Sequence, residues 1–392
     1  MKIEASRRLQ GIGSYAFAEV DKRVEQLRAR GITPIDFGVG DPTSPTPPMI
    51  RRAAAAGLEQ RKSSGYPSYV GHPGFREAVA QWVEKRFGIS VDPDTEISST
   101  IGSKEAVFNF HEGLVNPGDV VLCPSPGYPP YTRGTLFAEG VAYQLPMRRS
   151  RDFLIDFSEI PDRVADKAKL MWLNYPNSPS GATADEGFYR EALQFARKHD
   201  IVIASDEAYS EIYFAEAPIS ILNVERKGVL VFNSLSKRSA MTGYRMGWVM
   251  GDPELVAIFR KVKTNIDSGT PTFIQDAAIA ALAEEEHVQA FREEYRRKRD
   301  ILCAALIAAG LDDCTPEAAL YVWQKVPEGL TSLEFATRLL DDRIAIVTTP
   351  GNWIAEPTED GENPGQGYVR FALVPTIEDT EKAAERIAAM KF

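Results

Sequence analysis

Near-continuous apolar runs alternate with amphipathic helical patterns through the middle of this 392-residue chain. Apolar runs of this kind are typical of strands that are buried on both faces, and the helical patterns between them supply the layers that bury the strands. The alternation therefore predicts an α/β fold with a mainly parallel sheet flanked by helices. Strands are expected at 120–123, 169–173, 201–205, 228–232 and 246–250, with helices at 104–114, 186–199 and 253–265.

The pattern changes after a long helical region at 272–309. Further strands are expected at 320–326, 344–348 and 368–373, with helices at 332–341 and 377–390. This second pattern predicts a smaller α+β domain, which residues near the N-terminus complete. We therefore expect an N-terminal arm with part of the small domain at 1–48, a large domain at 49–285 and a small C-terminal domain at 286–392. A chain of this length can form two substantial cores.

The composition excludes several classes of protein. Apolar residues at 44% and charged residues at 26% are ordinary globular values. A net charge of −10 argues against a nucleic-acid partner, which needs a basic surface. The 3 cysteines and 4 histidines fit neither a disulfide framework nor a metal site in their spacing. No apolar run reaches about 18 residues, so we expect a cytoplasmic protein without a membrane partner.

Polar side chains follow several of the predicted strands at the points where the strands end. Tyr128 follows the first strand, 174–181 the second, 206–209 the third and Lys237 the fourth. In open parallel sheets, ligands bind at the carboxyl ends of the strands. The coincidence therefore predicts a binding site at this edge of the sheet.

The segment from Phe232 to Arg245 carries the most specific chemistry. A lysine at the edge of a sheet can form an imine with a carbonyl compound if it loses its proton. Ser234, Ser236 and Arg245 are donors suited to a phosphate dianion. A carbonyl compound that carries a phosphate is pyridoxal phosphate, the usual partner of such a lysine. Taken alone, the segment is equally well explained as a surface turn with Lys237 and Arg238 after a strand.

Other residues along the chain match the needs of that cofactor. Asp206 can stabilise a protonated pyridine nitrogen, although it could also cap a turn. Tyr209 can donate to the phenolic oxygen of the cofactor, and Tyr128 offers a flat face for stacking. Arg370 can bind a substrate carboxylate through two parallel hydrogen bonds. The turn at 102–104 opens a predicted helix and would present amide groups to a phosphate.

These motifs together resemble the fold-type I pyridoxal-phosphate aminotransferases over essentially the whole chain. The general motifs are Ser-x-Ser-Lys at 234–237 with Arg245 eight residues after the lysine, and Asp-x-x-Tyr at 206–209. Within this class the chain is most similar to the LL-diaminopimelate aminotransferases. Its subgroup motifs are Gly-Val-Gly-Asp-Pro at 38–42, Tyr-Pro-Ser-Tyr-x-Gly at 66–71, Ile-Gly-Ser-Lys-Glu at 101–105 and Asn-Tyr-Pro-Asn at 174–177.

The resemblance implies an enzyme that moves an amino group from LL-diaminopimelate, a related dicarboxylic amino acid or glutamate to 2-oxoglutarate in a ping-pong reaction. It also implies a homodimer with shared active sites. An N-succinyl-LL-diaminopimelate or aspartate/alanine-type aminotransferase is an alternative, since the stretch at 234–239 also resembles the N-succinyl-diaminopimelate aminotransferases. A carbon–sulfur β-lyase is another, because the residues that hold the cofactor do not decide the fate of the carbanion.

The resemblance also assigns roles to individual residues. Lys237 would bond the cofactor and move the proton between the substrate Cα and the cofactor C4′, with Asp206 and Tyr209 as the other catalytic residues. Tyr66 would reach the phosphate from a neighbouring subunit. The remaining cofactor-binding residues would be Ser103, Lys104, Tyr128, Asn177, Ser234, Ser236 and Arg245. The substrate would contact Tyr15, Gly38 and Arg370.

Two positions depart from the family pattern. The family usually has a second asparagine where Ser178 stands, and that asparagine hydrogen-bonds the phenolic oxygen of the cofactor. Whether Asn177 or Ser178 makes this contact here stays open. Plant-like members carry a glutamate at the position of Tyr69, where it holds the distal amine of the substrate, while some bacterial and archaeal members share the tyrosine.

Overall fold

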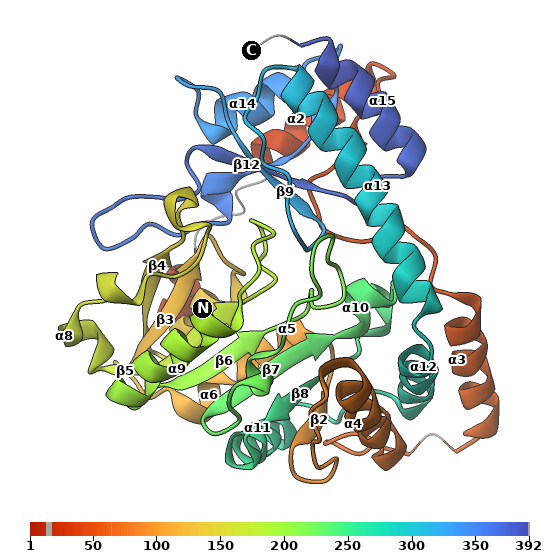
Figure 1. Cartoon of the computed structure of the whole chain (residues 1–392), viewed down its shortest axis with the longest axis vertical. Coiled ribbons are helices and arrows are strands. Elements are labelled where there is room, and N and C mark those ends of the chain that lie inside the picture. Colours follow the sequence, from red (N-terminus) through yellow and green to blue (C-terminus); the bar gives the residue numbers. More distant parts are fainter. Residues whose placement is uncertain (13–17, 64, 391–392) are drawn as a thin grey trace.

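A seven-stranded sheet forms the centre of the larger part of the protein (Figure 1). The structure, a computed structural model, describes residues 1–12, 18–63 and 65–390. The strand order is β2-β8-β7-β6-β5-β3-β4, and β8 runs antiparallel to its two neighbours while the other pairs are parallel. The strands are β2 Ile97–Thr100, β3 Val120–Ser125, β4 Val141–Pro146, β5 Ala168–Asn174, β6 Val202–Asp206, β7 Val229–Ser234 and β8 Gly247–Gly251.

The sheet confirms the five predicted strands and has two more, β2 and β4. The predicted apolar runs correspond to β3, β5, β6, β7 and β8, all of which lie in the interior of the sheet. The edge strand β4 was not expected, because it is partly exposed and carries no continuous apolar run. The helix predicted at 104–114 is interrupted at Phe110 and forms two short helices.

Helices cover both faces of this sheet. Apolar side chains of α4, α9 and α12 form one core with alternate strand residues such as Val229 and Val231. Their neighbours Leu230 and Phe232 point to the other face, where they pack with α5, α7 and α11. The helices of this part are α3 Pro48–Gln60, α4 Pro73–Phe87, α5 Ser103–Asn109, α6 His111–Leu114, α7 Pro130–Phe137, α8 Asp162–Ala165, α9 Glu186–His199, α10 Leu235–Arg238, α11 Pro253–Ile266 and α12 Thr272–Ala283.

A second, smaller part of the chain lies at the carboxyl edge of the large sheet (Figure 1). It holds an antiparallel sheet in the order β11-β12-β9 and the parallel pair β1-β10. Its strands are β1 Ile35–Asp36, β9 Tyr321–Lys325, β10 Ile346–Val347, β11 Thr349–Pro350 and β12 Tyr368–Ala372. Its helices are α2 Ala18–Ala29, α13 Glu286–Ala308, α14 Ser332–Leu339 and α15 Ile377–Ala388, and the short α1 Arg7–Gln10 precedes them.

Residues near the N-terminus belong structurally to the smaller part. Val20 and Leu27 of α2 pack with Leu340, Ala345 and Val347, and β1 pairs with β10. The domain boundaries at 48 and 285 stay a prediction, and the second of them falls between α12 and α13. Within the described ranges, the structure has no helix that is long and apolar enough to cross a membrane.

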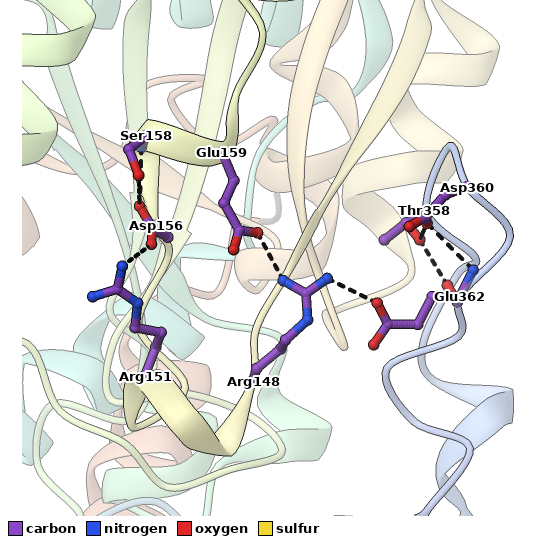
Figure 2. A network of polar contacts seen from close by, with 8 residues as sticks. All are labelled: Arg148, Arg151, Asp156, Ser158, Glu159, Thr358, Asp360 and Glu362. Carbon is purple, nitrogen blue, oxygen red and sulfur yellow. Dashed lines mark hydrogen bonds and ion pairs between the residues drawn. The ribbon is translucent and has the colours of Figure 1, made fainter.

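A polar network ties the loop before β12 to the larger part (Figure 2). Arg148 follows β4 and lies between Glu159 of the larger part and Glu362 of the loop, with N–O distances of 2.7 and 2.8 Å. The Ser125 hydroxyl donates to the carbonyl of Glu356 and accepts from its amide. The ion pairs are solvent-exposed, so each contributes little free energy. The hydrogen bonds of the buried Ser125 are therefore better evidence that the loop is held against the larger part.

Candidate active site

A cavity of about 660 Å³ lies where the carboxyl ends of the large sheet face β9 and β12. It brings together residues that were predicted for the site from separate segments of the chain, namely Ser103, Lys104, Tyr128, Asp206, Tyr209, Ser234, Ser236, Lys237, Arg245 and Arg370. It also takes in Ser178, the alternative to Asn177, and residues that were given no role, among them Gly40, Asn174 and Tyr321. The strand-end prediction therefore located a real cavity.

Lys237 lies in the middle of the cavity on α10, the short helix that follows β7. Its Nζ donates to the backbone carbonyl of Gly40 at 2.5 Å. Burial lowers the pKa of Lys237 below its ordinary value, and the nearby Arg370 and Arg245 lower it further, against the opposing effects of Tyr321 and Asp41. An amine whose proton is destabilised in this way can act as a nucleophile and a base.

Asp206 ends β6 and is almost completely buried, with 4% of its surface exposed. Tyr131 donates its hydroxyl to Oδ2 at 2.8 Å, and the amide of Ala208 donates to Oδ1 at 3.2 Å. Burial raises the pKa of Asp206 to about 6, and these two hydrogen bonds limit the rise. Tyr131 in turn stacks on Trp172, with ring centroids 4.7 Å apart. A buried carboxylate held by such partners is well placed to pair with a cationic group in the cavity.

Tyr209 meets a second tyrosine that sequence reasoning missed. The hydroxyls of Tyr209 and Tyr321 are 3.0 Å apart. Burial raises the pKa of Tyr209 well above its usual value. Burial also opposes ionisation of Tyr321, but the positive charges of Arg370 and Lys237 outweigh it and lower the pKa of Tyr321. Neither Tyr131 nor Tyr321 belongs to a sequence motif. Only the short distance of Tyr131 from Tyr128 in the sequence, and the position of Tyr321 in a predicted strand, could have suggested them.

The opposite end of the cavity gathers donors for an anion. Arg245 has a left-handed backbone with φ of 55°, and its guanidinium donates to the carbonyls of Thr242 and Ile101. Gly102 also has a positive φ, of 72°, and a Cβ there would lie 2.4 Å from Nη2 of Arg245. Only glycine lets this turn approach the guanidinium so closely. The hydroxyl of Ser234 accepts from the amide of Ser236 at 3.1 Å, which orders the turn before Lys237.

A buried ionic cluster contacts the turn that precedes α5. Lys263 of α11 is fully buried, and its Nζ lies 3.3 Å from Glu105 and 2.8 Å from Asp267. Glu105 follows Lys104 in α5 and accepts from the amide of Ile101 at 3.0 Å. Burial raises the pKa of Glu105, and the charge of Lys263 opposes this rise. The cluster therefore fixes the backbone that presents Ser103 and Lys104.

Arg370 reaches the cavity from β12. Its Nη2 donates to the carbonyl of Gly38 at 3.0 Å, and its Cζ lies 4.5 Å from the ring centroid of Tyr321. Its Nε is buried and has no hydrogen-bond partner among the residues that the structure describes. A buried donor without a partner is costly, so this guanidinium is suited to an anionic ligand.

Among the described residues, Gly38, Asn177 and Tyr66 were predicted for the site but do not line the cavity. Asn177 is fully buried in its own loop, where its side chain donates to the carbonyl of Asn174 and accepts from Ser180. Tyr66 is 87% exposed and does not line the cavity of its own chain. Tyr15 lies outside the described residues.

The residues of the cavity fit pyridoxal phosphate. Arg245, the hydroxyls and the glycine turn are suited to hold a phosphate, and Lys237 and the carboxylate of Asp206 line the same cavity. Arg370 lines the same cavity, and its unpartnered Nε offers a donor to a carboxylate. Asn174 donates to the carbonyl of Asp206 and accepts from the amide of Ser178, so it braces the loop at which the family pattern departs.

Comparisons with known proteins agree with this geometry. The sequence profile of the family "Aminotransferase class I and II" matches residues 32–387. The LL-diaminopimelate aminotransferase of Aquifex aeolicus is 46% identical over 99% of this chain and 100% of its own length. Among solved structures, a double mutant of Thermus thermophilus aspartate aminotransferase superposes with a TM-score of 0.90 at 30% identity, covering 99% of both chains. A probable N-succinyldiaminopimelate aminotransferase from Thermus thermophilus superposes with a TM-score of 0.88 at 32% identity, covering 95% of this chain and 99% of the other. The chain belongs to the class I and II aminotransferases.

Proposed function

We propose that this aminotransferase uses pyridoxal phosphate to move an amino group from LL-diaminopimelate to 2-oxoglutarate in a ping-pong reaction. The observation that carries the proposal is the convergence of Lys237, Asp206 and Arg370 in one cavity with donors suited to hold a phosphate. The assignment of LL-diaminopimelate as the substrate is based on the Aquifex aeolicus relative, which is 46% identical over its whole length.

The charged residues of the cavity have different roles in the proposed reaction. When bound, pyridoxal phosphate supplies an electron sink for the bonds at the substrate Cα. Asp206 holds the pyridine nitrogen in its protonated form, because a buried carboxylate stabilises a neighbouring cation. Lys237, with its lowered pKa, would take the proton from the substrate Cα and deliver it to C4′ when the cofactor is bound. Arg370 binds the α-carboxylate and so orients the Cα–H bond toward Lys237.

The phosphate end provides binding and anchoring. Arg245 and the hydroxyls of Ser103, Ser234 and Ser236 hold the phosphate, and Lys104 adds positive charge at the rim of the cavity. Tyr128 lines the cavity and offers its ring as a stacking surface. Ser178 lines the cavity whereas Asn177 does not, which supports Ser178 as the residue that contacts the phenolic oxygen.

A homodimer would explain the exposure of Tyr66. An aromatic side chain that is 87% exposed leaves a large apolar surface in water, and Tyr69 of the same loop is 40% exposed. In an isologous pair this loop reaches the neighbouring cavity, where the hydroxyl of Tyr66 contacts the phosphate. Phenylalanine at position 66 should therefore weaken cofactor binding, measured by titration of the apoprotein, and leave the dimer intact in sedimentation.

Single-turnover absorbance tests the proposal directly. Holoprotein is mixed with LL-diaminopimelate, its N-succinyl derivative, glutamate, aspartate, alanine or cystathionine in the absence of a 2-oxo acid. Loss of the yellow absorbance with LL-diaminopimelate and with glutamate, in near-stoichiometric amount, is the expected result. Loss with glutamate or the N-succinyl derivative but not with LL-diaminopimelate would overturn the donor. Persistent yellow colour with continuous pyruvate release from cystathionine would identify a lyase.

A variant pair separates the role of Lys237 from general damage. Lys237→Ala should bind the cofactor without bonding it covalently and should lose turnover. Lys261→Ala, at an exposed lysine of α11, is the matched control and should remain active. Turnover by Lys237→Ala at the wild-type rate would remove the central residue of the proposal.

A further inference from the structure

Tyr321 occupies the point where the two parts of the protein meet over Lys237. It is the first residue of β9 and only 4% exposed. Its hydroxyl lies 3.0 Å from the hydroxyl of Tyr209, which follows β6 of the large sheet. A methyl group on Gly40 would lie 2.1 Å from that hydroxyl, so the close approach requires a glycine at position 40. The carbonyl of the same Gly40 accepts from Lys237.

The ring of Tyr321 has a separate contact. Arg370 is paired with Trp323 across β9 and β12, and Tyr321 lies two residues before Trp323, on the same face of the sheet. The Cζ of Arg370 is 4.5 Å from the centroid of the Tyr321 ring. A guanidinium over an aromatic face is attracted by the ring quadrupole, and burial strengthens the attraction. The ring therefore limits the directions that Arg370 can take.

We propose that Tyr321 is a positioning residue with two separable roles: its hydroxyl orients the hydroxyl of Tyr209, and its ring seats the guanidinium of Arg370. The inference rests on the proposed function, because the two residues that it positions are those assigned to the cofactor and to the substrate carboxylate. It adds a residue of the smaller part to the group that controls the cofactor.

The hydrogen-bonding chain explains why a phenol is needed at this place. Tyr321 pairs with Tyr209, and Ser178 helps to lower the pKa of Tyr321, so Tyr321 lies between the loop after β5 and the loop after β6. A hydroxyl that already has one fixed partner loses rotational freedom, so its remaining direction is defined. Tyr209, whose pKa is raised by burial, keeps its proton and can donate it toward the cofactor.

The charged surroundings of the pair are mixed. The titratable groups that act on Tyr321 or on the adjacent Lys237 are Tyr209, Lys237 and Arg370, with Asp41, Arg245, Tyr128 and Tyr295 farther out. Loss of the Tyr321 hydroxyl weakens the hydrogen bond that Tyr209 can give. More negative charge then stays on the cofactor beside the Lys237 nitrogen, which keeps its proton to a higher pH.

Two substitutions separate the roles. Y321F removes the hydroxyl and keeps the ring, and Y321L removes both. In both variants the pH at which the bound cofactor changes its visible absorbance should rise by about 0.5 to 1 unit, which corresponds to one lost hydrogen bond. Only Y321L should also raise the KM for the dicarboxylic donor, by about 5-fold, because only it removes the ring beneath Arg370.

Y295F is the matched control, since Tyr295 of α13 is also a buried tyrosine, 3% exposed, near Tyr321. It should change neither the spectral pH nor the KM, and thermal unfolding of all three variants checks the fold. An unchanged spectral pH in Y321F overturns the hydroxyl role, and an equal KM in Y321F and Y321L overturns the ring role. Wild-type protein that binds the cofactor but transfers no amino group would instead overturn the proposed function, and the spectral comparison would remain readable.

Discussion

The two ends of the cavity are built in different ways. At the ring end, Asp206 is buried and already holds the hydroxyl of Tyr131 and the amide of Ala208. At the phosphate end, Lys104 and Arg245 are exposed, and Arg245 donates to backbone carbonyls at the mouth of the cavity. The ring end is organised before a ligand arrives, whereas the phosphate end offers charge that water solvates until a phosphate replaces it.

The difference follows from the cost of burying charge. A carboxylate away from water needs protein partners, or its pKa rises and it becomes neutral. Exposed cations need no such partners, so their support is placed beneath them, in the buried cluster of Lys263, Glu105 and Asp267. We therefore expect changes at the ring end to alter the chemistry, and changes at the phosphate end to alter binding of the cofactor.

The largest effect should come from Asp206→Asn. The substitution keeps the shape of the side chain but removes the charge that stabilises a protonated pyridine nitrogen. The rate of the half-reaction with glutamate should fall on the order of 1000-fold, about 4 kcal/mol, while the cofactor still binds. Stopped-flow absorbance measures this rate.

Glu207→Gln is the control for that prediction. Glu207 is the adjacent buried carboxylate, but it accepts from Ser205, Ser220 and the amide of Ile221, away from the cavity. Its half-reaction rate should stay close to wild type. Similar losses in the two variants would show that burial of a carboxylate, and not its place at the ring end, is what matters.

Lys263→Met should destabilise the fold by about 3 to 4 kcal/mol, because Glu105 and Asp267 then lack their buried cation. It should also weaken cofactor binding, since Glu105 holds the amide of Ile101 in the phosphate turn. Urea unfolding and titration of the apoprotein measure the two effects. Lys298→Met breaks a similar buried pair with Glu294 in the smaller part and should lower stability alone.

The pH dependence of apoprotein stability tests the electrostatic strain at the ring end. The pKa of Asp206 rises from 3.8 to about 6 on folding, so the folded protein holds this proton more tightly than the unfolded chain. The resulting stability is fully present below pH 3.8 and is lost as the pH rises through about 6. The gap is worth about 3 kcal/mol. Asp206→Asn should therefore match wild type in acid and exceed it in unfolding free energy by about this amount at neutral pH.

Chemical unfolding of cofactor-free protein between about pH 4 and about pH 7 provides the measurement for this prediction. Arg245→Leu serves as the contrast, because it removes no carboxylate and should therefore not show this pH dependence. If the free energies of unfolding of Asp206→Asn and wild type differ by the same amount across this range, the proposed cost of burying the charged Asp206 is wrong.

The smallest effect should come from Arg245→Leu. It removes charged hydrogen bonds to the phosphate and should raise the Kd of the cofactor about 30-fold, or about 2 kcal/mol. At saturating cofactor the half-reaction rate should stay near that of wild type, because Arg245 holds the phosphate and not the reacting atoms. A large loss of rate under saturation would remove the distinction between the two ends.

Local sequence patterns predicted the five interior strands of the large sheet and much of the ring end. Lys237, Asp206 and Tyr128 each follow an apolar run, and the strand-end rule places such residues at one edge of a parallel sheet. The phosphate donors around Lys237 lie within a single stretch of chain, so their proximity also follows from the sequence.

Contacts between distant segments were beyond the reach of these patterns. Tyr131 bonds Asp206 across 75 residues, and Tyr321 meets Tyr209 across 112. Neither tyrosine differs in sequence from an ordinary core residue. Asn177 shows the converse, because the family motif pointed to it while its side chain is used within its own loop.

The sequence by itself determined the class of fold, the edge of the sheet at which the cavity lies and the presence there of Lys237 and Asp206. These depend on apolar periodicity and on residue type, which are local properties. Only the tertiary structure decided which groups are buried together, and burial sets the lowered pKa of Lys237, the raised pKa of Asp206 and the position of Tyr321. The physical reason is that desolvation and hydrogen bonding depend on neighbours in space, which the linear order of residues does not contain.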